Sequence, residues 1–299
     1  MTGTLLRLLP VVVGIAVGLS LRRLGMLDHR DGETVFKIVF YVFLPALMFV
    51  SLSTVRLDRR FAVFPIAVVT ILVTGYAAAR LVAAKARMDP TQTAVLLTGC
   101  MIVNSGFALP FVQALYGPEG VARLATFDAV NTTVTFTLAY YVAARANPRH
   151  HGGSLLLGRL AKSPPLYAIA AGLVVNLTGV EVPAAIADPA TRFGSATAVL
   201  IPLGVGILFD PLGGPVGKAA LIVATRLVSG LVPMAILLLV GLHGPDRTII
   251  LLLGVAPLAF ASVTFASLEN LDVRLATSAL SLSLATSMIL SLLIVFASA

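Results

Sequence analysis

The sequence predicts an all-α membrane protein of ten transmembrane helices, arranged as two inverted five-helix repeats in which helices four and nine are broken and cross. The first observation behind this fold class is composition. Of 299 residues, 58% are hydrophobic and only 11% are charged, whereas soluble domains carry about 25% charged residues. The second is a series of apolar segments long enough to cross a bilayer. The third is an internal repeat of about half the chain length.

Ten apolar segments alternate with mostly short connections that contain Gly, Pro or charged residues. Because backbone polar groups in hydrocarbon must be paired within the segment, we expect each segment to be a helix. The predicted helices cover residues 4–21, 35–55, 61–84, 91–115, 121–143, 164–180, 193–209, 218–242, 247–267 and 273–297. The first is expected to be retained, since Arg22 and Arg23 follow it in place of a signal-peptide cleavage site.

The repeat is visible as matched positions in the two halves. The motif Arg-Leu-Ala-Thr begins at Arg123 and again at Arg274. Prolines inside apolar segments recur at similar offsets, in the pairs Pro10 and Pro165, Pro45 and Pro202, and Pro110 and Pro257. We therefore divide the chain into a first repeat (1–143), a linker (144–163) and a second repeat (164–299). Five helices per repeat is an odd number, so the second repeat enters from the opposite side.

The distribution of Arg and Lys predicts the orientation. Connections after odd-numbered segments carry more of these residues than the other connections do, which places both termini outside and the central loop in the cytoplasm of a cell (inner) membrane. The net charge of +8 is scattered between apolar segments. We therefore expect the lipid bilayer as a partner and not a nucleic acid.

Segments four and nine occupy equivalent places in the two repeats, and a proline interrupts each of them. Asn104, Ser105 and Gly106 precede Pro110, and Pro257 lies in the middle of segment nine. We expect each proline to be the first residue of a new half-helix, whose free N–H groups and positive dipole end favour an anion. The alternative is a pair of proline kinks with no ligand.

Segment five and segment eight carry buried charge. Asp128 and Asn131 share a helix face, and an acid inside a membrane segment is a candidate for carrying a coupling proton or supporting the site. The alternative is a packing hydrogen bond near the membrane interface. Arg226 could contact substrate, an acid or a lipid phosphate, whereas Lys37 is expected to extend to the interface. The Ser and Thr residues of segment ten are expected to serve close helix packing.

This residue inventory favours transport of an anion. A transported cation would need several buried carboxylates, and the segments offer essentially one, Asp128. An intramembrane enzyme would need clustered carboxylates or His on facing helices, and the four histidines all lie outside the predicted helices. We expect no catalytic activity, no metal site and no cofactor.

The most specific motifs resemble the auxin efflux carrier family. Residues 104–110 read Asn-Ser-Gly-Phe-Ala-Leu-Pro, followed by Ala-Leu-Tyr-Gly at 114–117 and Phe-Asp-Ala-Val-Asn at 127–131. Further matches lie at 44–47, 201–206 and 256–257. The resemblance covers essentially the whole chain, and the short central loop is similar to the bacterial branch. It implies the ten-helix fold of the bile acid sodium symporters, organic anion substrates, and a scaffold that often dimerises, so a homodimer is expected.

The chain departs from the family pattern at segment nine. Plant carriers place an Asn before the proline, where Gly254, Val255 and Ala256 stand here. The bile acid branch places a sodium-site acid just after it, where residues 258–260 read Leu-Ala-Phe. Coupling to H⁺ is therefore expected over coupling to Na⁺.

Together these features predict a secondary active transporter of a small organic anion, such as a mono- or dicarboxylate, that works by alternating access. The predicted substrate-binding residues are Asn104, Ser105, Gly106, Pro110, Asn131, Pro257 and Phe260. Asp128 and Arg226 are expected to support the site or carry coupling. The alternatives are a passive anion channel and an anion-binding membrane sensor on the same scaffold.

Overall fold

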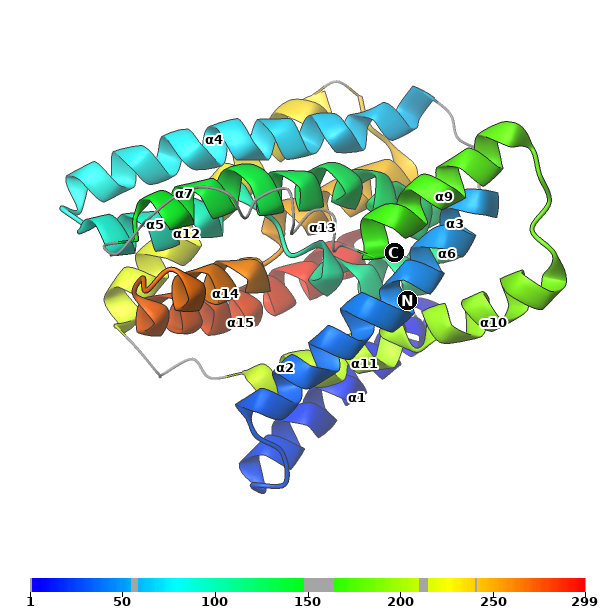
Figure 1. Ribbon diagram of the computed structural model, residues 1–299, viewed down its shortest axis with the longest axis horizontal. Helices are drawn as coiled ribbons and strands as arrows, with labels where there is room; N and C mark the ends of the chain where they lie inside the picture. Colours follow the sequence, from blue (N-terminus) through cyan, green and yellow to red (C-terminus); the bar gives the residue numbers. More distant parts are fainter. Residues whose placement is uncertain (1, 55–58, 148–163, 210–214, 240, 299) are drawn as a thin grey trace.

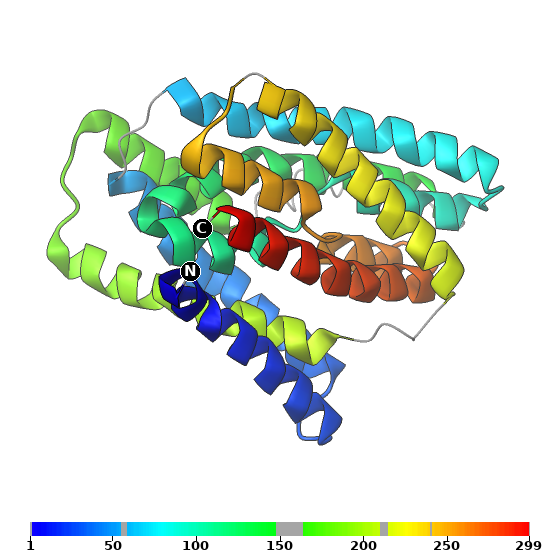
Figure 2. The same ribbon diagram turned by 180° about the vertical axis from the view of Figure 1, so that it is seen from behind.

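The computed structural model describes residues 2–54, 59–147, 164–209, 215–239 and 241–298. Within these ranges every regular element is a helix, as the sequence predicts. Figures 1 and 2 show an elongated bundle in which α1 (Thr2–Arg23), α2 (His29–Ile38) and α11 (Thr197–Leu208) lie along one edge. The long helix α4 (Val63–Lys85) lies along the opposite edge.

The remaining elements follow in chain order. In the first half they are the π-turn η1 (Val39–Phe43), α3 (Leu44–Thr54), the 3-10 turn η2 (Arg59–Ala62), α5 (Pro90–Met101), α6 (Ser105–Val134), the π-turn η3 (Thr135–Ala139) and α7 (Tyr140–Arg145). In the second half they are α9 (Pro164–Thr178), α10 (Ala184–Ser195), α12 (Val216–Leu239), α13 (Gly244–Val255), α14 (Phe260–Leu268) and α15 (Val273–Ser298). The predicted linker lies outside the described residues from residue 148 to 163.

Among the described residues, seven helical stretches are long and apolar enough to cross a membrane. They are Arg30–Thr54, Val63–Lys85, Pro90–Arg145, Ala184–Leu208, Val216–Leu237, Gly244–Leu268 and Val273–Ser298. The third has 56 residues, far more than one crossing needs. Its backbone leaves the helical region at Gly117 (φ 56°, ψ −146°), and α7 at its end packs against α5 at its beginning. This stretch therefore folds back on itself into two antiparallel segments.

Two predicted boundaries are wrong. The predicted loop after segment four reduces to the single non-helical residue Gly117, because Pro118 is well placed to begin a helix. The predicted seventh segment, 193–209, begins instead at Ala184, since α10 and α11 join at Ala196 into one apolar stretch. Asp188 and Arg192 lie within α10, and both are exposed at the surface, where they bury no charge.

The composition of α4 illustrates why these helices suit lipid. Its inward face packs Phe64, Val68 and Ile71 at no more than 1% exposure, while Ile66 and Val73 on the other face are more than half exposed. A helix that is apolar on both faces is stable only where its outer face also avoids water. The same pattern of exposed large apolar side chains recurs on most long helices of the described chain.

Glycines allow the closest helix contacts. A Cβ on Gly18 of α1 would lie 2.2 Å from the carbonyl oxygen of Leu203 in α11, and one on Gly206 would lie 2.2 Å from that of Ile15. Gly172 of α9 approaches the backbone of Phe49 in α3 in a similar way. Without a hydrophobic force between helices in lipid, such close backbone packing is a main source of association.

Asp89 begins α5 as its N-cap. Its carboxylate accepts hydrogen bonds from the amides of Thr91 (2.9 Å) and Gln92 (3.0 Å), and Pro90 follows it as the first helical residue. Partial burial alone would raise the pKa of Asp89, but these bonds and the charge of Lys218 outweigh it and lower that pKa. The ionised cap is therefore in place at neutral pH and is lost only as the pH falls through the lowered pKa.

A buried ion pair joins the two halves of the chain. The Nε of Arg123 in α6 donates to Oδ1 of Asp246 in α13 at 2.6 Å, and both side chains are less than a tenth exposed. The guanidinium also donates to Glu119 at 2.8 Å and lies 5.0 Å above the ring of Phe61. Removing one member of such a pair would leave an uncompensated charge in the interior.

Candidate functional site

The first helix break separates α5 from α6. The chain is extended at Ile102 (φ −125°, ψ 153°), and the next helix begins at Ser105 with Asn104 as its N-cap. The prediction that this half-helix starts at Pro110 is wrong. Asn104 starts it earlier because its side-chain oxygen accepts from the amide of Phe107 at 3.2 Å. Pro110 lies inside α6, where it cannot donate to the carbonyl of Gly106.

The second break separates α13 from α14. Residues 256–259 are not helical, and α14 begins at Phe260. Pro257 therefore lies within the extended segment and is not the first residue of the half-helix, contrary to the prediction. The reason is that a proline disfavours the helical region for the residue before it, and Ala256 is accordingly extended (φ −59°, ψ 146°).

The two breaks meet. The backbone amide of Asn104 donates to the carbonyl oxygen of Pro257 at 3.3 Å. This bond joins the unwound segments of the two halves directly, as the paired breaks in the sequence suggested. Both residues are buried, so the bond is shielded from water and is correspondingly costly to leave unmade.

A polar side chain from a later segment of the same half holds each break. Asn131 of α6 accepts from the amide of Val103 at 3.1 Å and donates to its carbonyl at 2.9 Å. In the second half, the hydroxyl of Ser283 in α15 accepts from the amide of Leu258 at 3.2 Å. Sequence reasoning missed Ser283, which was assigned to helix packing with its neighbours. The usable signal was its place in the repeat, since Ser283 falls one position from the counterpart of Asn131.

Asp128 links the first break to the second half of α6. Its Oδ1 accepts a short hydrogen bond from the hydroxyl of Ser105 and a longer one, 3.5 Å, from Nδ2 of Asn131. Its Oδ2 accepts from the hydroxyl of Thr132 at 3.2 Å. The carboxyl is buried, and its hydrogen-bond partners within the described chain are all neutral. The structure thus brings together three predicted site residues, and adds Thr132.

One polar group at the crossing has no hydrogen-bond partner among the described residues. The Nδ2 atom of Asn104 is buried and donates to no atom of the described chain, although its side-chain oxygen is used as the helix cap. A buried donor without an acceptor costs about 1–3 kcal/mol. The Nδ2 atom of Asn104 is therefore the position at which a hydrogen-bond acceptor on a ligand would be most stabilising. The ring of Phe260, by contrast, packs against that of Phe36 in α2, with 4.3 Å between the ring centroids and a tilt of 43° between the planes.

Arg226 lies with the second break and not with the Asp128 cluster. It is 1% exposed, and its guanidinium donates to the carbonyl oxygens of Leu253 (3.2 Å) and Gly254 (3.5 Å) at the end of α13. Carbonyls in the last turn of a helix lack their usual partner four residues later, although that of Leu253 also accepts from the amide of Ala256 at 3.3 Å. A cation there also matches the helix dipole. Arg226 thus supports the break from the neighbouring helix α12.

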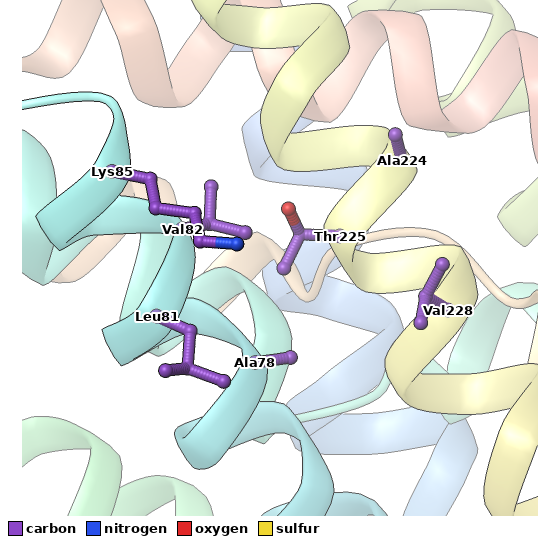
Figure 3. Close-up of a pocket in the computed structure, with 7 residues that line it drawn as sticks. All are labelled: Ala78, Leu81, Val82, Lys85, Ala224, Thr225 and Val228. Carbon is purple, nitrogen blue, oxygen red and sulfur yellow. The ribbon is translucent and has the colours of Figure 1, made fainter.

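A groove between α4 and α12 is separate from this site. Figure 3 shows Lys85 of α4 pointing toward Thr225 of α12 among apolar side chains. The groove has a volume of about 370 Å³. Its lining residues are Ala78, Leu81, Val82, Lys85, Ala224, Thr225 and Val228. It contains none of the predicted site residues, and an apolar groove on such helices suits lipid chains better than an anion.

Comparison with known proteins agrees with the motifs. The chain matches the membrane transport protein family over residues 4–295. An uncharacterised transporter of Methanothermobacter thermautotrophicus is 29% identical over 289 residues, which cover 94% of each chain. An uncharacterised transporter of Methanocaldococcus jannaschii is 23% identical over 283 residues, or 91% of each chain. The predicted family is therefore confirmed: the chain belongs to the membrane transport protein family, that of the auxin efflux carriers, and is a multi-pass membrane protein.

Proposed function

We propose that this protein is a secondary active transporter of a small organic anion, which binds where the two broken helices cross. The observation that carries the proposal is the meeting of the breaks at Asn104 and Pro257, with the unpaired Nδ2 of Asn104 beside it. Transporters with broken helices bind their substrate at such half-helix ends. Alternating access would then expose this buried site to each side of the membrane in turn.

The pattern of helix contacts supports an inverted repeat of ten crossings. In the proposed repeat, α1 corresponds to α9 and α3 corresponds to α11. The contact of α1 with α11 should therefore have a counterpart between α9 and α3, and both contacts are present. The contact of α4 with α5 likewise becomes that of α12 with α13, and that of α4 with α6 becomes that of α12 with α15. Such an exchange is expected from two copies of one unit related by a pseudo-two-fold axis.

The chemistry of the crossing favours an anion. Both α6 and α14 begin there, and the first N–H groups of a helix lack intrahelical partners and carry partial positive charge. A carboxylate could accept from Asn104 and from these N–H groups together. A mono- or dicarboxylate is therefore the proposed substrate class.

Asp128 is the proposed carrier of a coupling proton. Its partners Ser105 and Thr132 are hydroxyls, which can donate to a carboxylate or accept from a carboxylic acid. Both protonation states can thus be hydrogen-bonded without moving the helices. We expect Asp128→Asn to retain anion binding but to lose the dependence of uptake on a pH gradient in proteoliposomes. Uptake by Asp128→Asn that still follows the pH gradient would exclude this role.

The Arg and Lys distribution supports the proposed orientation, with both termini outside and the central loop in the cytoplasm of a cell membrane. Cysteine labelling from each side of the membrane, at single cysteines introduced near Gly25 and near Ala86, would test the orientation.

A homodimer is also proposed, on the family resemblance alone.

The experiment that tests the site is thermal unfolding of the purified protein with a panel of mono- and dicarboxylates. A ligand at 100 times its Kd stabilises by about 2.7 kcal/mol, which corresponds to a rise in Tm of several degrees. We expect Asn104→Ala to abolish the effect of the stabilising carboxylate. Asn176→Ala is the matched control, because that amide donates to Leu52 in α3, away from the crossing. Stabilisation that survives Asn104→Ala would place the site elsewhere.

Counterflow in proteoliposomes separates the transporter from its rivals. A carrier accelerates entry of labelled anion when unlabelled anion is loaded inside, whereas a passive channel does not. An anion-binding sensor would give stabilisation without any uptake.

A further inference from the structure

The second break is held by a cation, Arg226, whereas the ionisable group at the first break is the acid Asp128. In both halves a glycine lets one helix touch the last turn of the broken helix. A Cβ on Gly75 would lie 2.2 Å from the carbonyl oxygen of Cys100, and one on Gly230 would lie 2.1 Å from that of Gly254. Four residues before Gly230 stands Arg226, whereas four residues before Gly75 stands Ile71, which is fully buried. The same packing motif therefore forms without an arginine.

The position of Arg226 is one at which a metal cation could bind. Backbone carbonyls at the C-terminal end of a half-helix in a broken-helix transporter coordinate the coupling cation. Here Arg226 donates to two such carbonyls, those of Leu253 and Gly254. No acidic side chain of the described chain forms an ion pair with Arg226, and its Nε has no hydrogen-bond partner there. Its positive charge is therefore balanced by backbone carbonyl dipoles.

We infer that Arg226 is a built-in cation that takes the place of a coupling metal ion at the second break. This inference rests on the proposed function as a transporter of anions. A guanidinium is weakly hydrated and always charged, so it can hold unwound carbonyls in a dry site without being loaded and released in each cycle. The transporter consequently does not need sodium to order its second break.

The experiment compares Tm values of the purified protein in sodium chloride and in choline chloride at equal ionic strength. For the wild type, and likewise for Arg226→Lys, we expect the Tm in sodium chloride to equal the Tm in choline chloride to within about 1 °C. Arg226→Ala should unfold at a lower temperature in choline, and sodium or methylguanidinium should raise its Tm by about 3 °C or more. Arg192→Ala is the control, since this arginine is exposed on α10 and its loss should create no response to sodium.

The variant Arg226→Met separates charge from packing, because it restores apolar volume without charge. We expect it to be less stable than Arg226→Lys. Sodium stabilisation of the wild type would overturn the inference, because a metal site would then exist beside Arg226. Equal stability of Arg226→Met and wild type would overturn it as well, since the position would then need only volume. If Arg226→Ala and Arg226→Met both fail to fold while Arg226→Lys folds, the requirement for charge is supported.

The outcome is independent of the test of the proposed function. If the Tm of the wild type does not respond to sodium and the protein binds no carboxylate, the proposal of an anion transporter is rejected, but Arg226 remains the charge that orders the break. If the wild type binds a carboxylate at Asn104 and its Tm also rises in sodium, only the inference of a built-in cation is rejected.

Discussion

At the scale of single residues, the breaks depend on side chains that replace lost helical hydrogen bonds. Asn131 satisfies both backbone groups of Val103 with one amide, and Asn104 caps the helix that follows. An unwound segment inside a membrane is tolerated only where its polar groups find such partners. The amides are therefore as necessary to the fold as the apolar core.

Asn131→Ala should be strongly destabilising. It would leave the buried N–H and C=O of Val103 unpaired, at about 1–3 kcal/mol for each group, so the Tm should fall by several degrees. Thr133→Ala on the same helix removes an exposed hydroxyl that bonds only to the preceding turn at Ala129. If both variants unfold at the wild-type temperature in a thermal scan, Asn131 does not hold the break.

Residue-level prediction succeeded where the spacing alone was sufficient. Asp128 and Asn131 lie three apart on one helix, so their shared face follows from helical geometry. The start of the half-helix at Ser105 did not follow, because the proline signal at Pro110 was given more weight than the capping ability of Asn104. Which backbone amide Ser283 meets depends on the packing of α15 against the break, which no local pattern contains.

At the scale of helices, each broken helix ends in close contact with a neighbouring helix. Gly230 of α12 lies against the carbonyl of Gly254 where α13 ends. The two glycines bring the backbones together and let Arg226 reach the last turn. The sequence located the break in segment nine, but it did not identify the neighbouring helix that stabilises it.

Gly230→Ala should therefore destabilise the protein, by about 1–3 kcal/mol, as overpacking does elsewhere. Its Cβ would overlap both the carbonyl oxygen of Gly254 at 2.1 Å and a guanidinium nitrogen of Arg226 at 2.5 Å. Gly217→Ala on the same helix is the control, because a Cβ there meets nothing within 4 Å, and alanine favours a helix. Thermal unfolding of the two variants would contradict this reading if their Tm values were equal.

At the scale of the whole molecule, the two halves are interlocked. Helix α1 of the first half packs mainly against α11 of the second half, and α3 packs mainly against α9. Apolar length predicted most of the segments, since membrane thickness fixes it. The pairing of helices could not be predicted, because it depends on glycine positions such as Gly18 and Gly206 meeting across the bundle.

The ion pair of Arg123 and Asp246 provides a test of this interlocking. Asp246→Asn would leave the buried guanidinium with only Glu119 as an acid partner, so we expect a loss approaching the 3–5 kcal/mol typical of a broken buried pair. The double variant Arg123→Met with Asp246→Leu should recover much of it, because neither charge then remains. The pairing would be refuted if denaturation showed that the effects of the single substitutions on the free energy of unfolding simply add in the double variant.

The glycine seam between α1 and α11 has a consequence for synthesis in the cell. Helix α1 emerges from the ribosome well before α11, so the two cannot meet until all of the chain between Arg23 and Thr197 has been made. Until then the surface of α1 around Gly14 and Gly18 faces lipid or another protein of the insertion machinery. A nascent chain stalled before α11 would present this surface as an open docking site, where quality control could distinguish an unfinished protein from a finished one.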